Sequence, residues 1–346
     1  MLSRFLSCRE RFRLKCVCGL EPHDKWNHRL GYGNMWHTCE ESLAAGRHHF
    51  DALAAHSECM CVRYPLQRAE ITKWHNVCCV QFPEYVEHWD SHPDVRNRTP
   101  LMQEQVFDVP YELPSGRTVR LRGKWDSVDL ITDDVSGPSG GIYLQENKTK
   151  GDVDKLQIER QLKFDLQTMV YLIALREYRS DLRKGGFRSL SVTGSPVLGV
   201  RYNVVRRPLS GGRGTIVQHK ARGSKAAETE AEFYERLRRD YITADPDYWF
   251  FRVRSEVSER DIDVFRKTCL DPLLETLCWW YEEIILKAVG KPFQRVDDDP
   301  PPTNYRTPFG VYSALEEGGA TEYDAYLETG SESGLRRVHE LFTELA

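Results

Sequence analysis

Residues 123–126 read Gly-Lys-Trp-Asp, and residues 142–148 read Ile-Tyr-Leu-Gln-Glu-Asn-Lys. The second stretch is rich in residues that favour β-structure, so we expect it to form a strand. Alternate side chains of a strand share a face, and Glu146 and Lys148 should therefore point the same way. This stretch places an acid and a base side by side on one surface of a predicted sheet.

A second carboxylate belongs to the preceding strand-like run. Asp126 ends the quoted tetrapeptide within a β-prone run from Thr118 to Ile131, and residues 132–141 contain the turn signals Asp-Asp, Gly-Pro and Gly-Gly. A hairpin of this kind gathers two carboxylates and a lysine. Carboxylate oxygens suit a divalent metal that activates water for phosphodiester cleavage, while a lysine can steady the nucleophile or the developing charge. The alternative is a solvated hairpin edge that carries an ordinary ion pair.

An amphipathic helix is predicted over residues 155–177, after the lysine. Its apolar residues recur at helical spacing, namely Leu162, Leu166, Met169, Val170 and Ile173. A second stripe contains Arg160, Lys163, Gln167 and Tyr171, of which the last two are neighbours on the helix surface. Beside a metal centre, a glutamine and a tyrosine suit contacts to a DNA phosphate. The alternative is an ordinary polar helix face with a half-buried tyrosine.

These motifs together resemble those of a known enzyme group. The Glu146-Asn-Lys148 strand after Asp126 resembles the PD-(D/E)XK nucleases, and Gln-x-x-x-Tyr after that strand resembles their RecB-like branch. Gly33-Asn-Met-Trp-His37 fits the Gly-x-x-x-His that opens a helix in the same branch, and Asn34 is a candidate cap for that helix. The order of motifs over residues 1–312 is similar to that of phage- or plasmid-borne exonucleases.

The resemblance implies an α/β restriction-endonuclease-like core, a central mixed sheet flanked by helices with the site on one edge. It implies that His37, Asp126, Glu146 and the backbone carbonyl of Asn147 hold Mg²⁺ or Mn²⁺, with Lys148 as the catalytic lysine beside Asp126 and Glu146. The implied DNA contacts are made by Gln167, Tyr171, Lys150 and Arg160. Some RecB-like enzymes carry a glutamate just before a strand, and Glu104 precedes the alternating run of residues 106–109. A structural capping role for Glu104 is the alternative.

The function implied by this resemblance is a Mg²⁺- or Mn²⁺-dependent DNA exonuclease that hydrolyses phosphodiester bonds at DNA ends. The setting would be phage or plasmid recombination and repair, with a recombination or annealing protein as a partner. Three alternatives stay open. They are a structure-specific or defence endonuclease on the same scaffold, a non-catalytic DNA-binding scaffold subunit, and a zinc-stabilised interaction protein.

The chain has ten cysteines, and their positions differ from those of some of these relatives. CRISPR-adaptation nucleases, among others, hold an iron–sulfur cluster with one N-terminal cysteine and three near the C-terminus, but residues 300–315 contain none, so we expect no cluster. A Cys/His-rich insertion around residues 56–79 has Cys-x-Cys and Cys-Cys spacing rather than the Cys-x-x-Cys usual for zinc. We therefore expect packed thiols rather than zinc at Cys59, Cys61, Cys78 and Cys79.

Charged residues are unevenly distributed along the chain. The net charge is −4, but residues 296–346 hold eleven acids against three bases. Local basic stretches govern phosphate affinity, and residues 199–225 carry seven Lys or Arg and no acid. We expect a nuclease domain over residues 1–295 and an acidic extension over residues 296–346. The residues up to Lys15 lack the apolar core of a signal peptide, and no run is long enough to span a membrane. A cytoplasmic location with reduced thiols is the expectation.

Overall fold

The computed structural model describes residues 1–22, 26–90, 92, 97–132, 141–151, 153, 158, 165–184, 195–210, 215–223, 226–288 and 335–337. The chain forms two compact units. We call one the sheet unit, which comprises Trp26–Tyr111 and Arg120–Phe265. The other is the terminal unit, which comprises Met1–Lys25, Glu112–Val119 and Arg266–Ala346. The predicted boundary at residue 295 stays a prediction, because the residues around it lie outside the described ranges.

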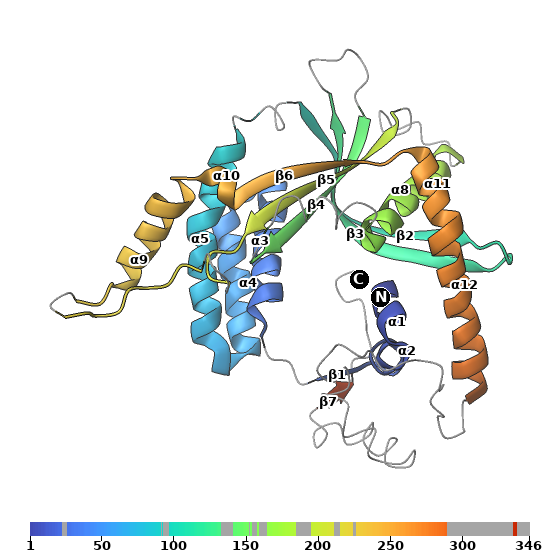
Figure 1. Cartoon of the computed structure of the whole chain (residues 1–346), viewed down its shortest axis with the longest axis horizontal. Helices are drawn as coiled ribbons and strands as arrows, with labels where there is room; N and C mark the ends of the chain where they lie inside the picture. Colours follow the sequence, from blue (N-terminus) through green and yellow to red (C-terminus); the bar gives the residue numbers. More distant parts are fainter. Residues whose placement is uncertain are drawn as a thin grey trace. The chain divides into compact units, whose positions relative to one another are not determined.

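A five-stranded mixed sheet forms the centre of the sheet unit (Figure 1). Strand β4 pairs antiparallel with β3 and parallel with β5, and β5 pairs antiparallel with β6. Parallel strands covered on both faces read as continuous apolar runs, which explains the buried Ile-Tyr-Leu segment at the start of β4. In sheet order the strands are β2 (Arg98–Glu112), β3 (Thr118–Ile131), β4 (Gly141–Lys150), β5 (Val197–Arg206) and β6 (Phe250–Glu256).

Helices lie on both sides of this sheet (Figure 1). One layer contains α3 (His28–Ala44), α4 (His49–Arg63) and α5 (Arg68–Asp90), with the short helix η2 (Pro65–Gln67) between the last two. The other layer contains α8 (Leu166–Lys184) and α11 (Glu259–Phe265). The remaining helical segments of the unit are α9 (Glu230–Arg236), η3 (Leu237–Ile242) and α10 (Pro246–Trp249). The expected α/β fold, a mixed sheet flanked by helices, is confirmed.

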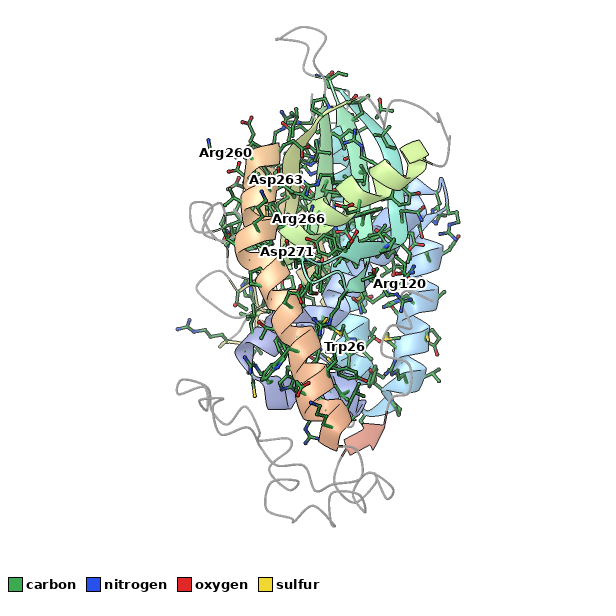
Figure 2. The ribbon with its side chains drawn as sticks, turned by 90° about the vertical axis from the view of Figure 1, so that its right-hand side faces the viewer. Trp26, Arg120, Arg260, Asp263, Arg266 and Asp271 are labelled. Carbon is green, nitrogen blue, oxygen red and sulfur yellow. The ribbon has the colours of Figure 1, made fainter. Side chains whose placement is uncertain are left out.

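Side-chain packing fixes each helical layer. Trp36 of α3 lies against two rings of α5, with ring centroids 5.0 Å from Phe82 and 5.1 Å from Tyr85. On the other layer, Arg176 of α8 pairs with Asp263 of α11 at 2.7 Å. Figure 2 shows Asp263 on the helix that begins at Glu259. These contacts hold α3 and α8, the two helices that carry candidate site residues, in place within the unit.

The terminal unit brings together segments from distant parts of the sequence. Phe5, Phe12 and Trp280 pack edge to face, with ring centroids 5.3 to 5.8 Å apart. Arg117 forms ion pairs with Glu282 at 2.8 Å and with Glu275 at 3.4 Å. The elements of this unit are α1 (Leu2–Ser7), α2 (Arg9–Phe12), η1 (Arg13–Val17), β1 (Leu20–Pro22), η4 (Arg266–Leu270), α12 (Asp271–Trp280), η5 (Tyr281–Ile285), η6 (Leu286–Ala288) and β7 (Leu335–Arg337).

Two expectations about element boundaries were wrong. Helix α3 begins at His28 rather than near Gly33, because Asn27 caps it by accepting a hydrogen bond from the Arg29 backbone N–H at 2.9 Å. Asn34 therefore lies inside the helix. Glu104 does not precede its strand but lies within β2. Among the described helices, none is both long enough and apolar enough to cross a membrane.

Candidate metal and active site

The β3–β4 hairpin joins Asp126 to the Glu-x-Lys strand. Ser127 pairs with Gln145 in the antiparallel register, which places Asp126 level with residues 146–147. The Oδ2 atom of Asp126 accepts a hydrogen bond from the Asn147 backbone N–H at 2.7 Å. This bond fixes one carboxylate oxygen and leaves the other directed toward helix α3.

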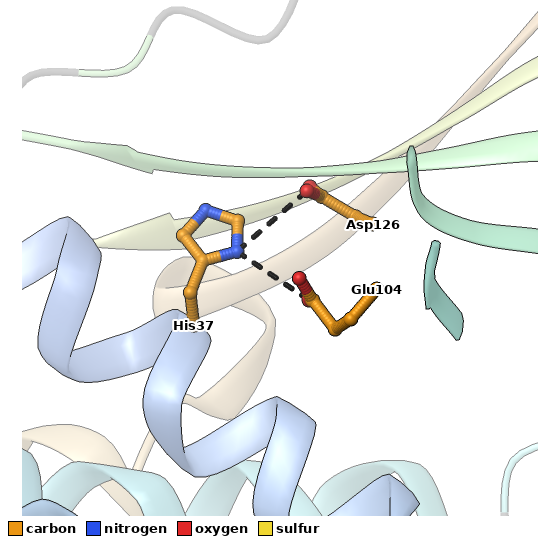
Figure 3. A group of neighbouring side chains, drawn as sticks. All are labelled: His37, Glu104 and Asp126. Atoms are coloured by element: carbon orange, nitrogen blue, oxygen red, sulfur yellow. Dashed lines mark ion pairs between the residues drawn. The ribbon is translucent and has the colours of Figure 1, made fainter. Parts of the chain in front are cut away.

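Helix α3 brings His37 to this carboxylate, and β2 brings Glu104. The Nδ1 atom of His37 lies 3.7 Å from Asp126 Oδ1 and 3.9 Å from Glu104 Oε1 (Figure 3). One ligand atom from each of the three residues lies within 4.8 Å of the others. It is the only such group of three or more His, Cys, Asp or Glu residues in the described part of the chain. Imidazole nitrogen and carboxylate oxygen are suitable ligands for a divalent cation such as Mn²⁺.

Glu104 reaches this group through an uncommon backbone conformation. Its φ is +47°, and it is the sole non-glycine residue with positive φ in the described segments. A non-glycine residue in this region is strained, and such strain concentrates at functional sites. The carboxylate is also held by Lys124, whose Nζ lies 2.8 Å from Glu104 Oε2 and 3.8 Å from Glu41 Oε2.

Glu146 lies beside this group and is held by its own contacts. Its Oε1 accepts hydrogen bonds from Lys148 Nζ at 2.5 Å and from Gln167 Nε2 at 3.0 Å. Gln167 also donates to the hydroxyl of Tyr171 at 3.2 Å. The Tyr171 ring lies against Gly123, where a Cβ atom would come 2.9 Å from that ring. The Phe107 ring would come closer still, at 2.5 Å, so the glycine of the quoted tetrapeptide makes room for both rings.

Burial raises the pKa of two acids of the site, Asp126 and Glu146. Burial, together with the nearby Asp126 carboxylate, raises the pKa of Glu146 to about 7. Burial also raises the pKa of Asp126 above its usual value. Although burial opposes protonation of His37, its interactions with Glu104 and Asp126 prevail and raise the pKa of His37 to about 9. A divalent cation would stabilise the ionised form of both acids and would take the place of the proton on His37, so the donor set fits Mg²⁺ or Mn²⁺.

The other predicted site residues have different surroundings. Lys150, at the end of β4, has a lowered pKa because it is partly buried and close to the positive charges of Lys148 and Arg207. The side chain of Asn147 points to the opposite face of β4 from Glu146, where it accepts a hydrogen bond from Asn203. Arg160 lies outside the described residues.

The Cys/His-rich segment forms part of helices α4 and α5. Cys61 and Cys78 are buried, whereas Cys59 is exposed. The Cys78 sulfur lies 3.9 Å from that of Cys39, and Cys79 lies 3.4 Å from His75 Nε2. These pairs are distributed along the helical layer, and the group of candidate metal ligands in the described residues lies elsewhere, at His37.

Lys124 and Glu41 were not among the residues selected from the sequence. Lys124 lies two positions before Asp126 on β3, and Glu41 lies four positions after His37 on α3. Both spacings place a side chain on the same surface as the predicted ligand, so strand and helix periodicity alone could have identified them.

Comparison with known proteins identifies the family. A search of the curated proteins finds no match to the chain. The family model of the PD-(D/E)XK nuclease superfamily matches residues 1–260, which is most of the chain. The match covers His37, Glu104, Asp126 and the Glu146–Lys148 strand. The chain therefore belongs to the PD-(D/E)XK nuclease superfamily.

Proposed function

We propose that this protein is a Mg²⁺- or Mn²⁺-dependent DNA exonuclease of the RecB-like branch, acting at DNA ends. The observation that supports this most is the cluster of His37, Glu104 and Asp126 ligand atoms beside the Glu146–Lys148 pair. The sequence motifs imply this arrangement, in which a helix before the sheet provides an imidazole and the hairpin provides two acids and a lysine. The proposed setting is phage or plasmid recombination and repair in the cytoplasm, with an annealing or recombination protein as partner.

The proposed ligands of the cation are His37, Asp126, Glu146 and the Asn147 carbonyl, to which the geometry adds Glu104. A bound divalent cation would polarise the phosphate and lower the pKa of a water molecule. The backbone N–H of Asn147 holds Asp126 Oδ2, which leaves Oδ1 directed toward His37.

Lys148 has the position and charge for the proposed catalytic role. Although its burial works against the charge, the Glu146 carboxylate prevails and raises the pKa of Lys148. Lys148 thus stays protonated at neutral pH, so that its ammonium can orient an attacking water and offset charge on the phosphate. Gln167 holds the Glu146 oxygen that Lys148 also contacts.

We propose that Gln167 and Tyr171 also position the DNA strand, and that Lys150 and Arg160 bind its phosphates. Gln167 and Tyr171 are neighbours on α8 and both lie at the carboxylates. A strand that follows α8 across the site would place a phosphate within reach of Lys148, and contacts of this kind carry no sequence information.

The test is degradation of an end-labelled linear duplex in Mg²⁺ or Mn²⁺. Asp126→Ala and Lys148→Ala should abolish it while the far-UV circular dichroism spectrum stays unchanged. The matched controls are Asp51→Ala and Lys73→Ala, which remove an exposed acid and an exposed base from the helical layer. A fully active Asp126→Ala variant would overturn the assignment.

A covalently closed plasmid, tested in parallel, separates the proposed activity from its rivals. An exonuclease leaves the closed circle intact, whereas an endonuclease on the same scaffold cleaves it. Mn²⁺ that raises the melting temperature without any cleavage would instead indicate a non-catalytic DNA-binding subunit.

A further inference from the structure

A buried polar network lies on the face of β4 that points away from Glu146 and Lys148. Asn203 of β5 is the register partner of Asn147 in the parallel pair. Its amide nitrogen donates to Asn147 Oδ1 at 2.9 Å and to the Tyr85 hydroxyl at 2.6 Å. Gln145 adds a longer bond to Asn147 Oδ1 at 3.3 Å. The network therefore connects the middle residue of the Glu-x-Lys motif to helix α5.

The same amide reaches the helix that carries His37. Asn203 Nδ2 lies 3.5 Å from Glu40 Oε1, and Glu40 is three residues after His37 on α3. Asn203 thus contacts β4, α3 and α5 at one point. Two of these elements, β4 and α3, supply the proposed cation ligands Glu146 and His37.

The burial of the Asn203 amide costs folding free energy, which indicates that the residue has a role beyond packing. Asn203 is fully buried, and its Oδ1 has no hydrogen-bond partner among the described atoms. A buried polar atom without a partner is unfavourable, and an apolar side chain of similar size would avoid the penalty. A residue that served packing alone would more readily be a leucine.

We propose that Asn203 is a positioning residue for the cation site, acting through the Asn147 peptide. By holding the Asn147 side chain, Asn203 fixes the backbone of Asn147, whose N–H binds Asp126 and whose carbonyl we assigned as a ligand. Residues behind the ligands commonly set their orientation, and their loss typically lowers metal affinity by about 10- to 100-fold. This inference depends on the proposed cation site.

The test measures Mn²⁺ affinity of the full-length protein by isothermal titration calorimetry. Asn203→Leu keeps a side chain of similar size and removes the hydrogen bonds to Asn147, Tyr85 and Glu40. It should weaken Mn²⁺ binding about tenfold or more. The control is Gln81→Met, because Gln81 is also a buried amide and links the same α3, α5 and β5 layers through Tyr32 and the Arg206 carbonyl. Gln81→Met should change Mn²⁺ affinity less than twofold, although it too removes buried hydrogen bonds.

A double-mutant cycle with Asn147→Leu separates positioning from general destabilisation. If Asn203 acts through the Asn147 side chain, the double variant should bind Mn²⁺ no more weakly than either single variant. Three results would overturn the positioning role while leaving the cation site standing. They are an Mn²⁺ affinity of Asn203→Leu equal to that of the wild type, a loss of Mn²⁺ affinity in Gln81→Met as large as that in Asn203→Leu, and losses of affinity that multiply in the double variant. A wild-type protein that binds no Mn²⁺ would overturn the proposed cation site as well.

Discussion

The raised pKa of Glu146 predicts that removing its charge stabilises the protein when no metal is present. Its pKa is about 7 in the folded protein against an ordinary value of 4.5. Each pKa unit corresponds to about 1.36 kcal/mol, so an ionised Glu146 costs about 3 kcal/mol of folding free energy above pH 7. Glu146→Gln resembles the protonated acid and should recover that amount at pH 8.

The dependence on pH follows from the direction of the shift. A carboxyl whose folded pKa is raised imposes no cost below the unfolded pKa of about 4.5, and the cost grows as pH rises toward 7. In EDTA, Glu146→Gln should therefore melt close to the wild-type temperature at pH 4.5 and on the order of 5 °C higher at pH 8. Differential scanning calorimetry of both proteins at the two pH values measures this difference.

Glu104→Gln serves as a control from the same site for which we expect a stability change of the opposite sign. Although burial works against its charge, contacts with His37 and Lys124 prevail and lower the pKa of Glu104. Loss of that charge should therefore destabilise the protein at pH 8. Excess Mn²⁺ should raise the melting temperature of the wild type and not that of Glu146→Gln. If Glu146→Gln is no more stable than the wild type at pH 8 in EDTA, the electrostatic account of the site is wrong.

Three further predictions concern single residues. Mn²⁺ affinity should rise between pH 7 and pH 9 and then level off, because the cation must displace the proton that His37 holds up to about pH 9. Calorimetry in buffers of different ionisation enthalpy should show that proton being released. An Mn²⁺ affinity that does not change with pH would contradict His37 as a ligand. Glu104→Gly should be more stable than Glu104→Ala by about 1 kcal/mol, since only glycine adopts a φ of +47° without strain, and equal urea midpoints would refute this. Asp129→Ala should destabilise the protein by about 3–5 kcal/mol, because it leaves the fully buried Arg201, paired with it at 3.0 Å, without its carboxylate. Asp51→Ala, which removes an exposed carboxylate, provides the comparison for denaturant unfolding.

The sequence was sufficient for the elements that carry local signals. The alternating and apolar runs around Asp126 and Glu146, separated by turn residues, predicted strands β3 and β4, because strand period and turn chemistry are both local properties. The mixed sheet and its flanking helices followed from the family resemblance. Among the described residues assigned to the site, His37, Glu104 and Asp126 lie close together, as do Glu146 and Lys148; their roles stay predictions.

Long-range packing accounts for what the sequence did not reveal. The start of α3 was misplaced because two asparagines, Asn27 and Asn34, are both acceptable caps, and only the folded chain selects between them. The φ of Glu104 is imposed by its neighbours, and no local propensity predicts it.

The edge-to-face packing of Phe5 and Phe12 with Trp280 has a practical consequence for truncation. The family match ends at residue 260, so an expression fragment designed on that match would retain both phenylalanines and discard the tryptophan that covers them. Such a fragment would expose aromatic side chains to solvent and should aggregate more readily than the intact polypeptide. Trimming either extremity on its own therefore breaks a cluster to which both contribute.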